Sequence, residues 1–258
     1  MERTEYELMN AVEDRMWWYH GVHANALAYF RLQRRRAARA QPATSAQDGA
    51  SRPGPGLDAG CGTGGLLGKL AAAPDLASVV GLDYAQRAAE LARAKSGRPV
   101  VVGTVNDLPF GDGTLSVIFS MDVLCHRAVD QEGALREAYR CLAPGGFLVM
   151  NLPAYQWLHS VHDLRVHNAR RFSRPQAIAM LRAAGFTDVR ASYWNTLLFP
   201  LMLLRRKLLP ASDKSDVQLY PAPIEAIFRI ILSLERAMIR CGLTLPFGGS
   251  IIVAATKP

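Results

Sequence analysis

The residues best suited to chemistry lie in a glycine-rich segment near residue 60. Asp58 stands two residues before Gly60, and Gly62 and Gly64 follow at alternate positions. Glycines at this spacing allow a tight strand-to-helix turn whose backbone can approach a ligand closely. Asp83 follows about 20 residues later, where a carboxylate accepts hydrogen bonds from ribose hydroxyls. Together these residues predict a site for a ligand that contains adenosine.

The same segment also matches the pattern GxGxxG through Gly60, Gly62 and Gly65, which is typical of dinucleotide sites. A single match of this kind has little specificity. The carboxylate of Asp58 would repel a pyrophosphate, but it would attract an ammonium or sulfonium group. The sequence therefore favours a cationic adenosine ligand over a dinucleotide.

Short strands that alternate with helices must position these residues. The predicted strands are 57–58, 78–82, 99–105, 116–121, 146–152, 186–192 and 250–256, and the helices between them are 66–73, 85–95, 131–141 and 172–184. Such alternation indicates an α/β fold with a doubly wound, mostly parallel seven-stranded sheet. Ligands of these sheets bind at the carboxyl ends of the strands. That edge would hold residues 58–65, Asp83, 104–107 and 120–126.

The regions outside this alternation differ in composition. Residues 4–39 are expected to be helical, with Tyr6, Met9 and Tyr19 on one face. Residues 40–56 are rich in Ala, Ser, Gln, Pro and Gly, as flexible linkers are. We therefore expect an N-terminal helical cap (1–39), a linker (40–56) and a main domain (57–258). Within that domain, residues 193–249 contain two apolar helical stretches (195–209 and 224–241) and are expected to form a helical lid.

The composition excludes several classes of protein. Of the 258 residues, 50% are hydrophobic and 20% charged, which excludes intrinsic disorder and collagen-like repeats. The longest apolar runs, such as 197–204, are shorter than the ~20 residues of a membrane-spanning helix. The four cysteines form no CxxC pair, so no metal site or disulfide framework is predicted. Because residues 1–15 do not resemble a secretory signal, a cytoplasmic protein is expected.

Five segments, in the expected order, resemble the motifs of class I S-adenosylmethionine-dependent methyltransferases, in particular a type 11-like subgroup. They are Asp58–Gly64, Val80–Asp83, Leu108–Gly113, Asp122–His126 and Leu142–Phe147. This resemblance implies a Rossmann-like methyltransferase fold, S-adenosylmethionine as cofactor, and methyl transfer to a small-molecule acceptor through an O, N or C nucleophile. The acceptor could be lipophilic or anionic.

The resemblance also implies which residues bind the cofactor. Gly60 and Gly62 would border its methionine part, Asp83 would hold the ribose, and Tyr84 would lie against the adenine. Thr104 stands where many relatives carry an Asp that contacts the adenine, so Asn106 or Asp107 is expected to take that role. The full predicted set is Asp58, Gly60, Cys61, Gly62, Asp83, Tyr84, Val105, Asn106, Ser120 and Met121. The alternatives are that Asp83 only caps the next helix and that Cys61 only fills the turn.

Transfer of a sulfonium methyl group needs alignment above all, and a base only when the acceptor is protonated. His126, after the fourth strand, is the first candidate base, and the alternative is that it only packs. His162 belongs to a second polar cluster with Asp163 and Arg170–Arg171, which either binds an acidic substrate or pins a loop. Tyr19 lies in an aromatic segment, 16–21, that resembles one methyltransferase subgroup. Its ring could shield and attract the sulfonium, or pack the helix against the sheet.

Several alternatives remain at this level. The 193–249 block could be a lid, a dimer interface or a peripheral membrane contact, so either a monomer or a homodimer is compatible. The net charge of +8 could suit a nucleic acid, but no nucleic-acid module is found and none is expected as a partner. The cofactor could also serve a non-methylating reaction, such as cyclisation of its aminobutyl group. A non-catalytic cofactor-binding protein is the remaining alternative.

Overall fold

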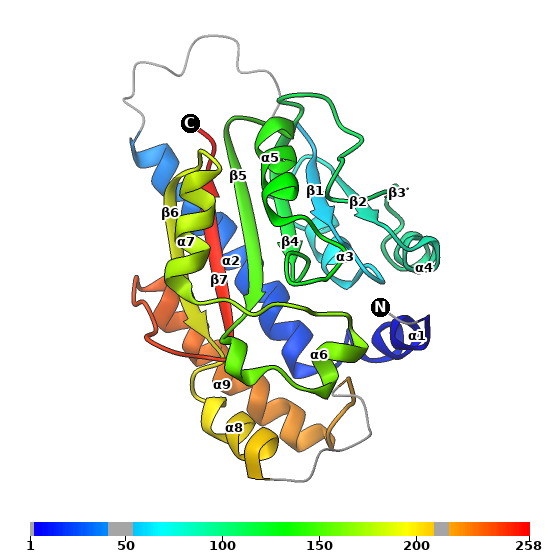
Figure 1. Ribbon diagram of the computed structural model, residues 1–258, viewed down its shortest axis with the longest axis vertical. Helices are drawn as coiled ribbons and strands as arrows, with labels where there is room; N and C mark the ends of the chain where they lie inside the picture. Colours follow the sequence, from blue (N-terminus) through cyan, green and yellow to red (C-terminus); the bar gives the residue numbers. More distant parts are fainter. Residues whose placement is uncertain (1–2, 41–53, 209–216) are drawn as a thin grey trace.

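The computed structural model describes residues 3–40, 54–208 and 217–258. Within them, seven strands form one sheet in the order β3-β2-β1-β4-β5-β7-β6 (Figure 1). The strands are β1 (Gly56–Ala59), β2 (Val79–Asp83), β3 (Val100–Val102), β4 (Leu115–Met121), β5 (Leu142–Pro153), β6 (Thr187–Trp194) and β7 (Ser250–Thr256). Neighbouring strands are parallel from β3 to β5, and β7 runs antiparallel to both β5 and β6. The predicted α/β, doubly wound, mostly parallel seven-stranded sheet is confirmed.

Helices cover both faces of the sheet. α2 (Trp17–Ala40) packs on β5, β7 and α3 (Gly65–Ala71), which in turn packs on α4 (Gln86–Ser96). α5 (Gln131–Cys141) and α7 (Arg174–Ala183) lie in front of the sheet in Figure 1, whereas α2 passes behind it. The direction of winding reverses between β1 and β4, and ligands bind at such switch points.

The other helices of the described residues surround the carboxyl edge of the sheet. They are α1 (Arg3–Val12), η2 (Gln156–Leu158), α6 (Val161–Arg165), α8 (Phe199–Leu208) and α9 (Ala222–Arg240). α9 packs on α2 at Gly21, where an added Cβ atom would lie 2.5 Å from Leu232 Cδ1. No helix among the described residues has the length and apolar character needed to cross a membrane.

The structure departs from the sequence prediction in the N-terminal region. The prediction of one helix over 4–39 is wrong, because α1 ends at Val12 and α2 begins only at Trp17. Glu13, between them, turns inward and accepts a hydrogen bond from the Thr63 hydroxyl at 2.5 Å. This contact across the fold overrides the local helical preference. Most of the predicted linker, residues 41–53, lies outside the described residues.

The predicted lid segment also begins differently. β6 continues to Trp194, so the first residues of the 193–249 block belong to the sheet. Trp194 is fully buried, and its indole N–H donates to Asn151 Oδ1 at 2.7 Å. The helices α8 and α9 follow it, close to the two predicted apolar stretches.

Candidate functional site

A cavity of about 1110 Å³ lies at the carboxyl ends of the strands beside the switch point. β1, β2 and β4 contribute Asp58, Asp83 and Met121 to its wall. The other walls come from α1, α2, the segments after β4 and β5, and residues of α8 and α9. Because ligand cavities commonly hold about 300–1,000 Å³, this cavity has room for more than one small ligand.

The glycine turn between β1 and α3 forms the floor of this cavity. Gly60 has a φ of 83°, and a Cβ atom there would lie 2.3 Å from Val123 Cγ2. Only glycine combines that left-handed conformation with such a close neighbour. The N–H groups of Gly60 and Cys61 both donate to the Leu82 carbonyl, at 2.7 and 2.9 Å. The turn is therefore tied to the end of β2.

Asp83 connects the turn to the start of α4. One of its carboxylate oxygens accepts from the Gly62 N–H at 2.9 Å, and the other accepts from the Ala85 N–H at 2.9 Å. Burial raises the pKa of Asp83, and these two hydrogen bonds oppose that rise. The hydrogen bond from the Ala85 N–H agrees in part with the alternative that Asp83 only caps the next helix. The N-cap residue of α4, however, is Ala85 and not Asp83. Each oxygen keeps a second lone pair for a ligand.

Asp58 is buried with one carboxylate oxygen left without a partner. Its Oδ2 atom is enclosed yet has no hydrogen-bond partner in the described residues, and the side chain borders the cavity. Burial, reinforced by the charges of Glu13 and Asp83, raises the pKa of Asp58 to about 8. A buried carboxylate of this kind has much to gain from a cationic ligand.

The segment between α1 and α2 is fastened over the glycine turn. Glu13 binds the Thr63 hydroxyl and forms a short ion pair with Lys95 of α4. Met9 of α1 lies above the turn, because a Cβ atom at Gly62 would approach Met9 Cε to 2.7 Å. Tyr6 of α1 is buried close to Asp83 and Tyr84. Its burial and these two neighbours raise the pKa of its hydroxyl group. Helix α1 thus forms one wall of the cavity.

Most predicted cofactor residues lie around this cavity. Those that border it are Asp58, Gly60, Cys61, Gly62, Asp83, Tyr84, Val105 and Met121. Burial raises the pKa of the Cys61 thiol, which agrees with a packing role. Ser120 is buried in β4 and does not border the cavity. Asn106 does not border it either, since its side chain binds the Ala128 carbonyl and the Asp130 N–H, both at 3.0 Å.

Aromatic side chains of α2 form the wall opposite the turn. Tyr19 borders the cavity with its ring 5.1 Å from Trp18, and burial raises the pKa of its hydroxyl. Trp17 packs edge to face on Phe228 of α9 at 5.2 Å. The Trp17 Nε1 atom is buried without a hydrogen-bond partner in the described residues. This wall is mostly aromatic, and its polar groups include the Trp17 indole N–H and the Tyr19 hydroxyl.

The predicted second polar cluster is largely a structural network. Arg171 Nη2 donates to both oxygens of Asp163, at 2.8 and 2.9 Å, and Nη1 donates to the Ala154 carbonyl at 3.2 Å. Arg170 Nη1 donates to the carbonyls of His126 and Val129, at 3.1 and 2.9 Å. Both arginines therefore pin the loop after β5. The side chain of His162, in α6, lies outside the described residues.

His126 lies where the sequence predicted it, on the wall of the cavity after β4. Burial lowers its pKa to about 4, so the imidazole is neutral at neutral pH and a weak base. In the described part of the chain, no group of three or more His, Cys, Asp or Glu side chains is placed to hold a metal ion.

This geometry coincides with a similarity to known proteins. Residues 57–150 match a family described as a methyltransferase domain. This segment is similar to that family. It contains the glycine turn, Asp83 and the end of β4, and therefore part of the cavity wall described above.

Individual proteins are also similar to this chain. An O-methyltransferase from Penicillium expansum is 36% identical over 101 residues, which cover 36% of this chain and 36% of that protein. The 24-methylenesterol C-methyltransferase 2 of Arabidopsis thaliana is 32% identical over 139 residues, covering 49% of this chain and 37% of that protein. The chain thus spans about a third of the length of these curated relatives. A solved S-adenosylmethionine-dependent methyltransferase from Thermotoga maritima shares the fold, with a TM-score of 0.52, 19% identity, and coverage of 98% of this chain and 99% of that one.

Asp122, directly after β4, is a candidate that sequence reasoning missed. It adopts a φ of 55°, which is rare for a non-glycine residue and is often found at functional sites. Asn151 Nδ2 donates to both of its oxygens, at 3.0 and 2.9 Å, and Trp194 holds Asn151 in turn. Burial raises the pKa of Asp122 to about 6, and the side chain borders the cavity. The signals in the sequence were its place at the end of a predicted strand and at the start of the Asp122–His126 segment.

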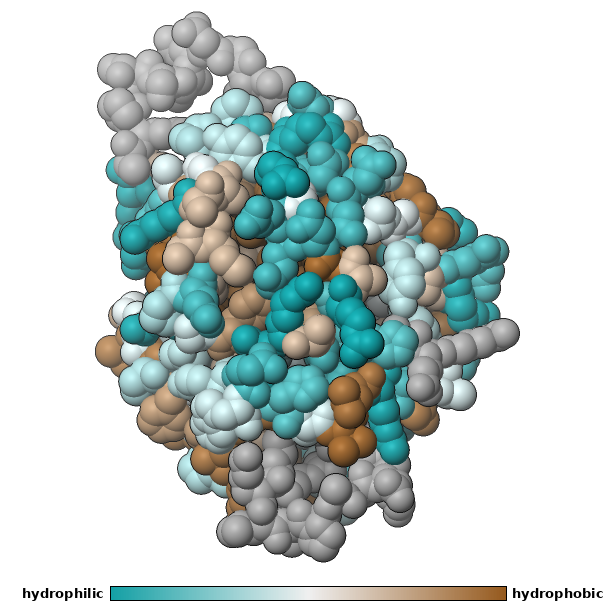
Figure 2. Space-filling view, viewed as in Figure 1, coloured by the Kyte–Doolittle hydropathy of each residue, from teal (hydrophilic) through white to brown (hydrophobic). Residues whose placement is uncertain are grey.

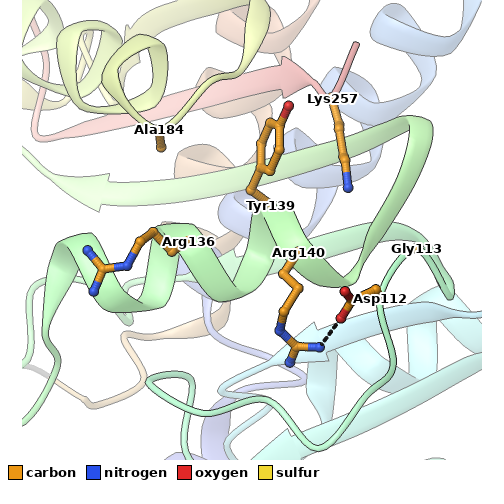
Figure 3. Close-up of a pocket in the computed structure, with 7 residues that line it drawn as sticks. All are labelled: Asp112, Gly113, Arg136, Tyr139, Arg140, Ala184 and Lys257. Atoms are coloured by element: carbon orange, nitrogen blue, oxygen red, sulfur yellow. Dashed lines mark hydrogen bonds and ion pairs between the residues drawn. The ribbon is translucent and has the colours of Figure 1, made fainter.

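A second hollow of about 510 Å³ lies between α5 and the residue after β7 (Figure 3). Its charges are already compensated within the protein. Arg140 binds Asp112 and Glu137, each at 2.7 Å. Lys257 Nζ donates to the Leu142 carbonyl at 2.8 Å and lies 4.7 Å from the Tyr139 ring. We therefore place the functional site in the larger cavity.

Proposed function

We propose that this chain transfers the methyl group of S-adenosylmethionine to a small, neutral, lipophilic acceptor. The observation that carries this proposal is the pair of buried carboxylates, Asp58 and Asp83, which face one cavity on either side of the glycine turn. The similarity to proteins named as methyltransferases supports it.

The residues around the turn fit this cofactor. The unpartnered Asp58 Oδ2 would bind its ammonium group, and the second lone pairs of Asp83 would bind the ribose hydroxyls. Tyr84, Val105 and Met121 would border its adenine and methionine parts. When bound, the cofactor supplies a methyl group that is already activated by the sulfonium. The protein then needs to align an acceptor and exclude water.

The rest of the cavity determines the proposed acceptor. Its wall contains apolar side chains from four segments, namely Trp17, Leu198, Met202, Val217 and Phe228. Two uncharged polar atoms there, Trp17 Nε1 and Asn195 Oδ1, are buried without a partner in the described residues. A donor and an acceptor of this kind suit the hydroxyl group of an apolar molecule, because a hydroxyl can both accept and donate. An anionic acceptor is disfavoured, because Arg170 and Arg171 are engaged within the protein.

Calorimetric titration tests the proposal. S-adenosylmethionine and S-adenosylhomocysteine should both bind with one-to-one stoichiometry, and incubation with a panel of phenols and fatty alcohols should yield products heavier by one methyl group. Consumption of the cofactor without any acceptor, followed by mass spectrometry, would instead indicate cyclisation or another non-methylating reaction. The absence of binding to either ligand would exclude the function.

Asp122 is our candidate for the base when the acceptor is a hydroxyl group. Because its pKa is raised to about 6 and only the ionised form accepts a proton, the rate should rise with pH through about 6 and then level off. Asp122→Asn should lower the rate about 10²–10⁴-fold and remove that rise. The measurement is the pH–rate profile with an acceptor from the panel. If His126 were the base instead, the profile would rise near pH 4 and persist in Asp122→Asn.

Tyr19 is our candidate for stabilising the positive charge of the cofactor through its ring. Tyr19→Phe keeps the ring and should bind S-adenosylmethionine as the unchanged protein does. Tyr19→Leu should weaken that binding by about 0.5–2 kcal/mol but leave the affinity for the uncharged thioether S-adenosylhomocysteine nearly unchanged. Calorimetry with both ligands measures the difference. Equal losses for the two ligands would show that Tyr19 only packs.

A further inference from the structure

A chain of buried hydrogen bonds ends at Asp122, the candidate base. The indole N–H of Trp194 in β6 donates to Asn151 Oδ1 at 2.7 Å, and Asn151 Nδ2 donates to both carboxylate oxygens of Asp122, at 3.0 and 2.9 Å. Hydrophilic residues cover most of the face of the molecule in Figure 2, whereas Trp194 and Asn151 are fully buried. Side-chain hydrogen bonds usually go to the backbone or to water, so three linked side chains inside the protein need a specific reason.

The indole ring of Trp194 determines which way the Asn151 amide points. An indole nitrogen can donate a hydrogen bond but cannot accept one, so the atom that meets it must be the amide oxygen. The NH₂ group of the amide then faces the carboxylate of Asp122. The opposite orientation would place the amide oxygen against the carboxylate oxygens. Trp194 therefore acts on Asp122 through Asn151, from two strands away in the order β5-β7-β6.

Asn151 also holds the backbone of Asp122. The Asp122 N–H donates to the Asn151 carbonyl at 2.9 Å, directly after the last pair of the β4–β5 ladder, Met121 with Asn151. At Asp122 the backbone turns to a φ of 55°, and the side chain borders the cavity. A residue other than glycine keeps this conformation only where its surroundings hold it. One residue of β5 thus fixes both the backbone and the carboxylate of Asp122.

Four other charged or titratable groups among the described residues interact with Asp122. They are Arg171, Asp163, Tyr19 and Cys125. The first two form an ion pair with each other at 2.8 Å, and their effects on the pKa of Asp122 have opposite signs. The other two are uncharged near neutral pH, because burial raises the pKa of both side chains. The hydrogen bonds from Asn151 therefore oppose the effect of burial on Asp122 more than any of these groups does.

We propose that Asn151 and Trp194 are positioning residues for Asp122, which hold its carboxylate at the cavity wall ready to accept a proton. An ionised carboxylate only accepts hydrogen bonds, so the amide NH₂ group stabilises this form rather than the protonated one. The role rests on the proposed function. There the hydroxyl proton goes to Asp122 while the acceptor oxygen forms a bond to the methyl carbon, and the carbon–sulfur bond breaks with its electron pair left on sulfur.

NMR of the unchanged full chain, without cofactor or acceptor, tests the contact between Asn151 and Asp122. The carboxyl carbon signal of Asp122, identified by its loss in Asp122→Asn, should titrate near pH 6. The side-chain amide signals of Asn151 should shift with the same midpoint, and the indole N–H of Trp194 should exchange slowly with solvent. Amide signals that do not follow the titration of Asp122 would overturn the proposal without any substitution in β5 or β6.

Two substitutions test the positioning residues one at a time. Asn151→Leu removes the amide at similar volume and should raise the titration midpoint of Asp122 by about 1–2 pH units. Trp194→Phe removes only the indole donor and should raise the midpoint by about 0.5–1 unit. Trp157→Phe, an exposed tryptophan of the loop after β5, is the matched control and should leave the midpoint unchanged. Thermal unfolding verifies that each variant is folded, and an unchanged midpoint in Asn151→Leu or Trp194→Phe would overturn the role of that residue.

The pH–rate profile with an acceptor from the panel connects this positioning to catalysis. In Asn151→Leu and Trp194→Phe the rise in rate should move to higher pH by the same amount as the titration midpoint of Asp122. A purely structural role would instead lower the rate by the same factor at every pH, and that result would overturn the proposal. If the midpoint moved but the rate profile did not, Asp122 would not be the base. The proposed function would then need another base, although Asn151 and Trp194 would still hold Asp122.

Discussion

Replacing Asp58 by Asn should make the unliganded protein more stable at high pH and weaken its binding of S-adenosylmethionine. The folded protein keeps a proton on Asp58 up to about pH 8, whereas the unfolded chain loses it near pH 4. The stability of the unchanged protein therefore declines as pH rises between these values. An Asn side chain carries no such proton, so the gain from Asp58→Asn should be small at pH 5 and reach several kcal/mol near pH 9.

Urea unfolding at pH 5 and pH 9 measures the predicted change in the free energy of unfolding. Asp112→Asn is the matched control, because Asp112 is an exposed carboxylate outside the cavity and its ion pair with Arg140 contributes little. The control should show a similar, small difference at both pH values. A gain for Asp58→Asn that does not depend on pH would contradict the assigned cause.

The expected change in the binding of S-adenosylmethionine has the same cause, the proton that Asp58 carries in the folded protein. A cationic ligand favours the ionised form of Asp58, so binding should release a proton and the affinity should rise with pH, by at most tenfold per unit below about 8. Calorimetry in two buffers of different ionisation enthalpy measures the released proton. In Asp58→Asn, binding should release no proton and the affinity should no longer rise with pH.

Asp83→Asn should weaken the binding of adenosine-containing ligands about 10–100-fold. A hydrogen bond to a charged group contributes about 1.5–3 kcal/mol, and each 1.4 kcal/mol corresponds to a factor of ten. The variant also places an NH₂ group against the N–H of Gly62 or Ala85, so some loss of stability is expected. Circular dichroism and thermal unfolding should establish a temperature at which the variant is folded before binding is measured.

A comparison of ligands separates the ribose contact from a general distortion. The unchanged protein should bind adenosine more tightly than 2′,3′-dideoxyadenosine, and Asp83→Asn should bind the two alike. If the variant still discriminated between them as the unchanged protein does, Asp83 would have only the structural role of holding the Gly62 and Ala85 N–H groups.

The sheet and the glycine turn could be predicted because their signals are local. The spacing of Gly60, Gly62 and Asp83 requires a turn after one strand and a carboxylate after the next. In the structure, the Gly62 nitrogen lies 2.9 Å from Asp83 Oδ2. Asp122 could not be identified in this way. Its left-handed backbone and raised pKa depend on burial and on Asn151, a residue of a different strand.

Contacts between distant segments also account for the remaining differences between the sequence prediction and the structure. The break between α1 and α2 depends on Glu13 reaching Thr63, 50 positions along the chain. The inward orientation of Glu225 depends on the start of α2, from which it is separated by 208 positions. Periodicity within a helix can indicate that one side is apolar. It cannot show that this side faces outward, as it does in α9.

The position of α1 has a kinetic consequence. This ten-residue helix lies against the backbone of the glycine turn through Met9, and it is held there by the contacts of Glu13 with Thr63 and Lys95. We infer that a cofactor bound beneath it leaves after those contacts break. The residence time of the spent cofactor, and with it the turnover rate, would then be governed by the opening of α1 rather than by the strength of the contacts that Asp58 and Asp83 make.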